Sequence, residues 1–356
     1  LCDESNCMNP ACVFCGSEPQ KKNKEHIFPQ WLLKMTGRDK KQLSVGSNWE
    51  TGHEIVFNAR SYTFPSCTRC NESFGEKEAD VKPIVKRLQA DHDVTGSEIE
   101  SLLDWFDKVR ISAWLGVKYM NKDVFDMDPK YYINARVGLK DRMLSITNTY
   151  KTEKALNWSG VNTLAFMLGP TAFTLRINNL VMVNCSSDFV VSEKLGFPFP
   201  EFERPNPASE KTDCSMVEGK RKAESQLFST KLYSPSIMVA QTIYKETLAG
   251  LREYYDNDYV RANSYSLANG IGKVFLSRKN TIGTIERDEA VNFAMPEAKS
   301  VFGHVEVVRP ALELQIELIE RKKRDLSLLS AQQRSRQLEG QEAVISNLRE
   351  QIAQYR

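Results

Sequence analysis

Two Cys-x-x-Cys pairs constrain this chain more than any other feature of its sequence. The first pair is Cys12 and Cys15, the second is Cys67 and Cys70, and 51 residues separate the two pairs. Two thiolates three residues apart can bind one Zn²⁺ from a tight turn, and four thiolates complete its tetrahedral shell. The spacing therefore predicts a small module, within residues 1–90, that a structural zinc ion holds together.

The segment around these pairs carries residues that a purely structural zinc module does not need. Glu25 and His26 open the sequence Glu-His-Ile-Phe-Pro, and Asn71 directly follows the second cysteine pair. A zinc ion shared by both pairs would hold the acid and the histidine against Asn71. Neutral imidazole, with a pKa near ~6.5, can accept a proton from water at neutral pH. Carboxylate and amide oxygens suit a hard cation such as Mg²⁺.

The order of these motifs resembles the HNH endonuclease family over about residues 10–90. The resemblance implies a ββα-metal fold, with the acid and histidine on its first strand and the asparagine at its helix. It also implies that His26 is the general base, that Glu25 and Asn71 hold a catalytic Mg²⁺ or Mn²⁺, and that the four cysteines hold structural zinc. Modules with this core resemble nuclease components of prokaryotic antiviral systems, so we expect a role in antiviral defence.

Two positions depart from the family pattern. The family's usual acid is aspartate, and Glu25 is one methylene longer, which leaves weaker metal binding and a different metal preference as alternatives. The family's middle asparagine, which braces the catalytic histidine through the backbone, has no cleanly spaced counterpart here. Asn58 is the candidate for this role, and His53 could instead enter the site from the strand region.

Basic residues accompany the predicted site. Because phosphate contacts position a nucleic acid without reading its sequence, these residues predict contacts with a DNA backbone, and DNA is favoured over RNA. An ordinary solvated surface is the alternative. The residues assigned to this role are Lys21, Lys22, Lys24, Arg60 and Arg69.

The overall charge adds nothing to this prediction. The chain has 48 Lys and Arg against 46 Asp and Glu, so only a local basic surface could attract a nucleic acid. The least charged stretch, residues 155–175, contains Gly169-Pro170 and several polar residues, so it does not suit a membrane-spanning helix. The N-terminus shows no apolar signal segment. We therefore expect a cytoplasmic protein that does not associate with membranes.

Cys2 and Cys7 are rival candidates for the zinc ligands.

The rest of the chain is predicted to be α+β. A long buried helix should start at Ser97, where Ser97-Glu98-Ile99-Glu100 reads as a capping box and apolar residues follow at helical spacing. This helix opens a regulatory or substrate-binding domain over residues 91–309. Its other expected segments are strands within 131–146, a basic patch over 136–142, a buried helix after 155, a strand over 171–183, a proline-rich linker near 196–222 and a helix near 223–255.

The C-terminal region, residues 310–356, is predicted to serve in assembly or partner binding. Residues 311–356 lack proline and should form one helix of about 70 Å. Its apolar residues form two short stripes and not one continuous coiled coil. The first stripe comprises Leu312, Ile316, Ile319 and Leu326, and the second comprises Leu338, Ile345, Leu348, Ile352 and Tyr355. Both stripes could pack on the protein's own middle domain. We expect instead that the distal stripe joins a second copy of the chain or a partner subunit.

The sequence thus predicts a metal-dependent endonuclease that hydrolyses phosphodiester bonds of DNA. The alternative is a zinc-stapled protein that binds nucleic acid or a partner without cleaving it.

Overall fold

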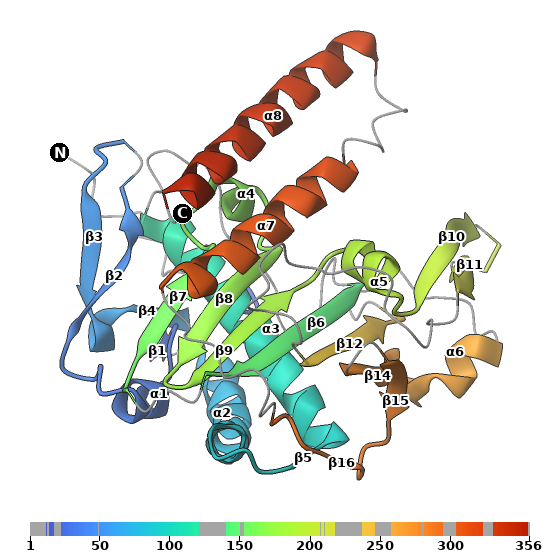
Figure 1. The fold of residues 1–356 in the computed structure, drawn as a ribbon, viewed down its shortest axis with the longest axis horizontal. Helices are drawn as coiled ribbons and strands as arrows, with labels where there is room; N and C mark the ends of the chain where they lie inside the picture. The colour runs from blue at the N-terminus through green and yellow to red at the C-terminus, as the bar shows by residue number, and fades with distance from the viewer. Residues whose placement is uncertain are drawn as a thin grey trace.

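The computed structural model describes most of the chain as a mixed α+β fold (Figure 1). The described residues are 12, 14–17, 23–48, 50–120, 140–149, 153–206, 208–209, 211–217, 237–245, 258–278, 281–294, 304–322 and 330–354. Within these ranges, no helix combines the length and the apolar character that crossing a membrane requires.

The helices are α1 (Gln30–Met35), α2 (Thr68–Gln89), α3 (Gly96–Met120), α4 (Leu164–Leu168), α5 (Val190–Leu195), α6 (Asp258–Ala262), α7 (His304–Lys322) and α8 (Ala331–Ala353). The strands are β1 (Asn23–His26), β2 (Gln42–Ser47), β3 (Glu54–Asn58), β4 (Thr63–Ser66), β5 (Val94–Thr95), β6 (Asp141–Asn148), β7 (Leu156–Ser159), β8 (Ala172–Ile177), β9 (Leu180–Cys185), β10 (Phe199–Asn206), β11 (Lys211–Val217), β12 (Ile237–Ile243), β13 (Ser264–Ser266), β14 (Ile271–Arg278), β15 (Thr281–Ile285) and β16 (Ala290–Val291).

An eight-stranded antiparallel sheet forms the centre of the molecule. Its strand order is β13-β14-β12-β6-β9-β8-β7, and β15 pairs with β14. Helix α3 packs on one face and helix α7 crosses the other (Figure 1). Because both faces are covered, β6, β8 and β9 are buried along their whole length.

The N-terminal part packs against the α3 side of this sheet. Strands β1 and β4 pair antiparallel, with Glu25 opposite Phe64 and His26 opposite Thr63, and α2 follows directly. Strands β2 and β3 form a second two-stranded sheet. One continuous hydrophobic core extends from Phe14 through α2 and α3 to the strands of the central sheet.

Helix α3 confirms the predicted long buried helix, but its capping residue differs from the prediction. The side chain of Glu98 accepts a hydrogen bond from the Thr95 N–H at 2.9 Å, and Thr95 Oγ1 accepts one from the Glu98 N–H at 3.4 Å. The capping box therefore begins at Thr95 and not at Ser97. Several residues between 95 and 100 are polar, so the sequence pattern of a capping box can be placed at Thr95 or at Ser97.

The central sheet corrects three predictions made from sequence. The segment 171–183 is a hairpin of β8 and β9, because Asn178 adopts a left-handed backbone (φ 53°) in the turn. Residues 237–243, predicted to be helical, form strand β12, whose apolar run suits a strand buried on both faces. The predicted helix after 155 is limited to α4, and β7 precedes it. Residues 131–139, 223–236 and 246–255 lie outside the described ranges.

The predicted linker near 196–222 contains the paired strands β10 and β11. Each strand of a two-stranded ribbon is an edge, so Pro200 and Pro205 remove no hydrogen bond that a central strand would need. The predicted basic patch over 136–142 is also corrected at its last residue, because Arg142 is buried and bonds to Asp104 and Asp107.

The predicted single C-terminal helix is two helices. Ser330 caps α8 through a capping box with Gln333, and α8 packs against α7. Leu312 of the first stripe and Leu348 of the second belong to one hydrophobic cluster. The two stripes therefore contact each other and α4 within the same chain. Leu326 and Tyr355, which the prediction also included, lie outside the described residues.

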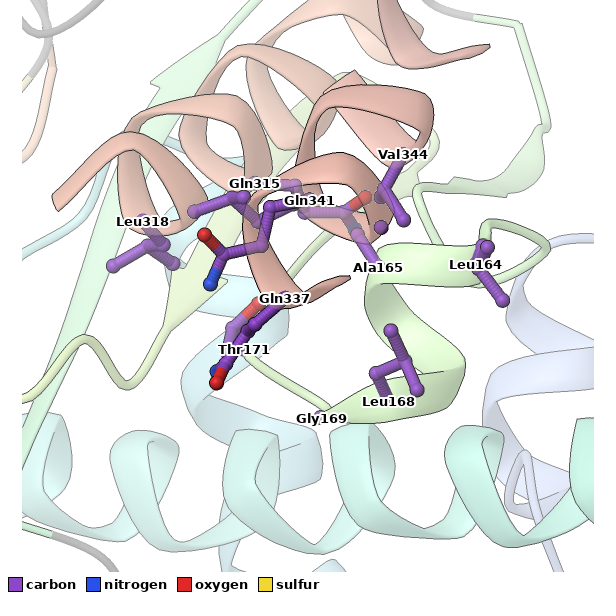
Figure 2. Close-up of a pocket in the computed structure, with 12 residues that line it drawn as sticks. Leu164, Ala165, Leu168, Gly169, Thr171, Gln315, Leu318, Gln337, Gln341 and Val344 are labelled. Atoms are coloured by element: carbon purple, nitrogen blue, oxygen red, sulfur yellow. The ribbon is translucent and has the colours of Figure 1, made fainter. Parts of the chain in front are cut away.

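A groove of about 450 Å³ remains between α4, α7 and α8 (Figure 2). Its lining is mostly apolar, and Leu168 at its rim is 73% exposed. Assembly with a second copy or a partner subunit remains a prediction.

We expect Thr95→Ala to lower the free energy of unfolding by about 1 kcal/mol, because the α3 N-terminus would lose its cap. Ser101→Ala is the control, since the Ser101 hydroxyl lies one turn further along α3 and donates to the Ser97 carbonyl instead of to the capping box. Urea unfolding measures both. An equal loss in the two variants would contradict the assignment.

The contribution of Glu98 should depend on pH. Burial raises the pKa of this carboxyl, but hydrogen bonds from Thr95 and the guanidinium of Arg87 outweigh it, so the pKa falls below its ordinary 4.5. A carboxyl with a lowered pKa stabilises the fold above the unfolded value, and the contribution is lost as pH falls through the folded value. Glu98→Gln should therefore be less stable than the wild type at pH 7, with the difference disappearing below pH 4.5.

Candidate functional site

Four cysteines converge at the N-terminal end of α2. The sulfurs of Cys12, Cys15, Cys67 and Cys70 all lie within 4.8 Å of one another. Sulfurs bound to tetrahedral zinc at about 2.3 Å lie about 3.8 Å apart. The Cys15 and Cys67 sulfurs are 3.7 Å apart. This set could hold a structural zinc ion, as the spacing predicted, whereas Cys2 and Cys7 lie outside the described residues.

Local backbone structure aims these sulfurs at one point. Gly16 adopts φ 72° and donates its N–H to the Cys12 carbonyl at 2.8 Å, which closes the first turn. Cys67 is the N-cap of α2, and its sulfur accepts a hydrogen bond from the Cys70 N–H. Phe14 anchors the first turn by packing on Phe74 of α2, with ring centroids 4.7 Å apart.

The thiols of this cluster differ in proton affinity. Burial raises the pKa of Cys15, but hydrogen bonds with Ser17 outweigh it and bring the pKa to about 6. Burial raises the pKa of Cys70 far above its ordinary value. Zinc binds thiolates, so metal binding must release protons and should weaken in acid.

Glu25 and Asn71 meet although they are 46 positions apart in the chain. Asn71 stands in the first turn of α2, and its Nδ2 lies 2.7 Å from Glu25 Oε2 and 3.1 Å from the Lys24 carbonyl oxygen. The second cysteine pair thus positions Asn71 at the end of β1, which the sequence order predicted.

A lysine from α3 completes this group, and sequence analysis did not identify it. Lys108 is fully buried, and its Nζ donates to Glu25 Oε1 at 2.6 Å, to Glu78 Oε1 at 2.9 Å and to the His26 carbonyl at 3.2 Å. Removing one partner of such a buried pair typically costs about 3–5 kcal/mol. Lys108 lies more than 80 residues from Glu25 in sequence. It stands among the apolar residues of α3 and belongs to no motif that would have identified it.

His26 is half-buried, and its ring has two polar neighbours. Gln30 Nε2 lies 2.7 Å from His26 Nε2, and the ring also hydrogen-bonds to the main chain of Arg60. The Arg60 contact favours the protonated ring, which identifies the Arg60 carbonyl as the acceptor. Burial lowers the pKa of His26 below its ordinary 6.5, and Glu25 only partly opposes this. The ring is therefore neutral at pH 7, as a general base requires.

Asn58 does not touch His26 in this arrangement. Its Oδ1 accepts a hydrogen bond from the Arg60 N–H at 3.1 Å and caps the short turn Ala59–Ser61. Asn58 thus shapes the turn whose carbonyl braces His26. His53 lies exposed between β2 and β3.

The predicted phosphate-binding residues are only partly described. Lys24, Arg60 and Arg69 are exposed on β1, on the turn before β4 and on the first turn of α2. Arg60 forms an ion pair with Asp39 at 3.2 Å. Lys21 and Lys22 lie outside the described residues.

The donor set of Glu25 and Asn71 fits a hard cation after one rearrangement. Octahedral Mg²⁺ with bonds near 2.0–2.1 Å needs neighbouring ligand oxygens about 2.9 Å apart. Asn71 here presents its amide nitrogen to Glu25. A half-turn of that amide would place its oxygen 2.7 Å from Glu25 Oε2 and would give up the hydrogen bonds to Glu25 and to the Lys24 carbonyl.

We compared the chain with models of protein families, with curated proteins and with solved structures, and none of the three comparisons gave a match. Its function is therefore inferred from the residues and their geometry.

We expect elemental analysis to find about one zinc ion per chain and Cys70→Ser to lose it. Apparent binding energy at a structural zinc site is about 10–16 kcal/mol and contributes directly to folding, so this variant should unfold at a lower temperature. Cys214→Ser, which changes a buried cysteine outside the cluster, should keep its zinc. A folded, zinc-free wild type would contradict the assignment.

Proposed function

We propose that the protein is a metal-dependent endonuclease that hydrolyses phosphodiester bonds of DNA, with His26 as the general base. One observation carries the proposal: Asn71, which directly follows the four-cysteine cluster in sequence, is hydrogen-bonded to Glu25, and Glu25 adjoins His26 on β1. The antiparallel pair β1 and β4, followed by α2, supports it, because the HNH family, which the sequence resembles, carries its acid, histidine and asparagine on such a ββα unit.

His26 would accept the proton of the attacking water. Its half-buried ring is neutral at pH 7, and the Arg60 carbonyl can hold the ring proton on one side while the other nitrogen accepts. Gln30 now contacts Nε2, so this amide must yield to the water or help to orient it.

Glu25 and Asn71 would hold Mg²⁺ or Mn²⁺, which supplies positive charge for the phosphate and the leaving oxygen. Lys24 directly precedes Glu25, and Arg69 lies two residues before Asn71. Both side chains are exposed and can contact the phosphate backbone. A role in antiviral defence belongs to the same proposal and is supported by the sequence resemblance.

A binding protein without cleavage activity is the second candidate, and one observation favours it. Both oxygens of Glu25 already have partners within the chain, Lys108 and Asn71. A metal must displace the second of these contacts, whereas a binding protein needs no such change.

We expect the purified protein to nick supercoiled plasmid with Mg²⁺ or Mn²⁺ and to stop when EDTA removes the metal. The His26→Ala variant should nick at least ~10²-fold more slowly, because the general base would be absent. Gel electrophoresis of the plasmid measures this. His53→Ala, an exposed histidine on the same module, is the control and should cut at the wild-type rate. Equal cutting by His26→Ala would refute the site, and DNA binding without cutting would favour the second candidate.

DNA binding should depend on salt. Each phosphate contact contributes a slope of about −0.9 to the logarithm of affinity against the logarithm of salt concentration for duplex DNA. Lys24→Ala/Arg69→Ala should therefore make that slope shallower by about 1–2 units. Lys86→Ala, at the far end of α2, is the control, and an equal change there would indicate non-specific charge effects.

A further inference from the structure

Lys108 is the most completely buried charge next to the candidate site. It belongs to α3, beyond the 1–90 module predicted from sequence, and its ammonium contacts two carboxylates and one carbonyl. The ring of Phe74 lies 5.4 Å from the same nitrogen. An ammonium buried among such groups is fixed in position, because each of its donors has an acceptor.

Two contacts of Lys108 hold the Glu25–His26 pair, and the third holds Lys108 itself in place. The bond to Glu25 Oε1 leaves Oε2 as the oxygen that faces Asn71. The bond to the His26 carbonyl holds the main chain between the acid and the base. Glu78, one oxygen of which takes the third donor, holds Lys108 from α2.

We propose that Lys108 is a positioning residue that offers one oxygen of Glu25 to a divalent cation and weakens the binding of that cation by its own charge. The proposal rests on the proposed function. Its electrostatic part follows from the arrangement, because a cation at Glu25 Oε2 shares its carboxylate with the ammonium at Oε1. Two positive charges this close repel each other, and the protein interior around them screens this repulsion far less than water does.

The proposed role predicts opposite changes in the affinity for the cation and in the rate of DNA cutting, whereas a purely structural role would not. Without the ammonium, the cation loses a repulsion and should bind more tightly. Glu25 then also loses the contact that fixes its rotation, so cutting at saturating metal should slow. Loss of stability alone would weaken both properties together.

Five variants of the zinc-loaded, 356-residue chain test the proposal at pH 8. Lys108→Met removes the ammonium, Lys108→Arg keeps the charge, and Glu78→Gln removes the second carboxylate. Lys108→Met/Glu78→Gln restores the wild-type net charge of the group without the ammonium. Electron paramagnetic resonance of free Mn²⁺ measures affinity, Glu25→Gln identifies the signal from this site, and plasmid nicking measures rate.

We expect Lys108→Met to bind Mn²⁺ about tenfold more tightly and Glu78→Gln about tenfold more weakly than the wild type. Lys108→Met should nick at least ~10-fold more slowly at saturating Mn²⁺. Lys108→Arg should recover the wild-type affinity and part of the rate. The double variant should bind Mn²⁺ like the wild type and still cut slowly, and it tests the proposal if Lys108→Met fails to fold.

Unchanged or weaker Mn²⁺ binding by folded Lys108→Met would overturn the proposal, as would a wild-type rate in the double variant or no Mn²⁺ binding by the wild type. Failure of the proposed function has a different signature. If the Mn²⁺ affinities follow the expected order but no protein nicks DNA, the endonuclease proposal fails and the tuning of metal binding by Lys108 stands. If the wild type cuts through His26 but the affinities do not change, the reverse holds.

Discussion

The buried ammonium of Lys108 is the interaction on which the arrangement of the candidate site depends. A charge without solvent must keep all of its partners, so Lys108 fixes α3 against both β1 and α2. The fit is tight elsewhere along the helix, because a Cβ at Gly116 would come within 2.8 Å of Ile27 and within 2.4 Å of the Tyr62 hydroxyl. A side chain at position 116 would therefore force the Tyr62 and Ile27 side chains to move.

The same helix ties the site to the central sheet. Within about one turn of Lys108 on either side, Asp104 and Asp107 bond to Arg142 of β6, and Arg110 bonds to Asn184 of β9. These groups are buried or nearly so, and their donors and acceptors face each other between α3 and the strands. Because α3 carries polar contacts toward β1 on one side and toward the sheet on the other, displacement of the sheet against α3 would strain the contacts at Glu25.

The parts that could be predicted from sequence are those that depend on local spacing. The four cysteines, the Glu25–His26 pair and Asn71 were identified because a turn or one strand sets their geometry, and the apolar face of α3 because its period is helical. The parts that were missed depend on distant partners. Nothing near Lys108 in sequence indicates that the carboxylates of Glu25 and Glu78 lie beside it. The run at 237–243 becomes a strand only because β6 and β14 flank it. The break between α7 and α8 was missed because both apolar stripes were assigned to one helix, whereas Ser330 and Gln333 cap a second helix.

The departure of Glu25 from the aspartate usual in the family that the sequence resembles has a physical reason in this arrangement. The carboxylate accepts from Lys108 at 2.6 Å and from Asn71 at 2.7 Å at the same time, from α3 and α2 respectively. An aspartate on the same backbone would end about one carbon–carbon bond, roughly 1.5 Å, earlier. It could not keep both contacts without moving β1, since hydrogen bonds weaken steeply beyond about 3.2 Å. The longer acid therefore lets one carboxylate contact both the buried lysine of α3 and the asparagine of α2.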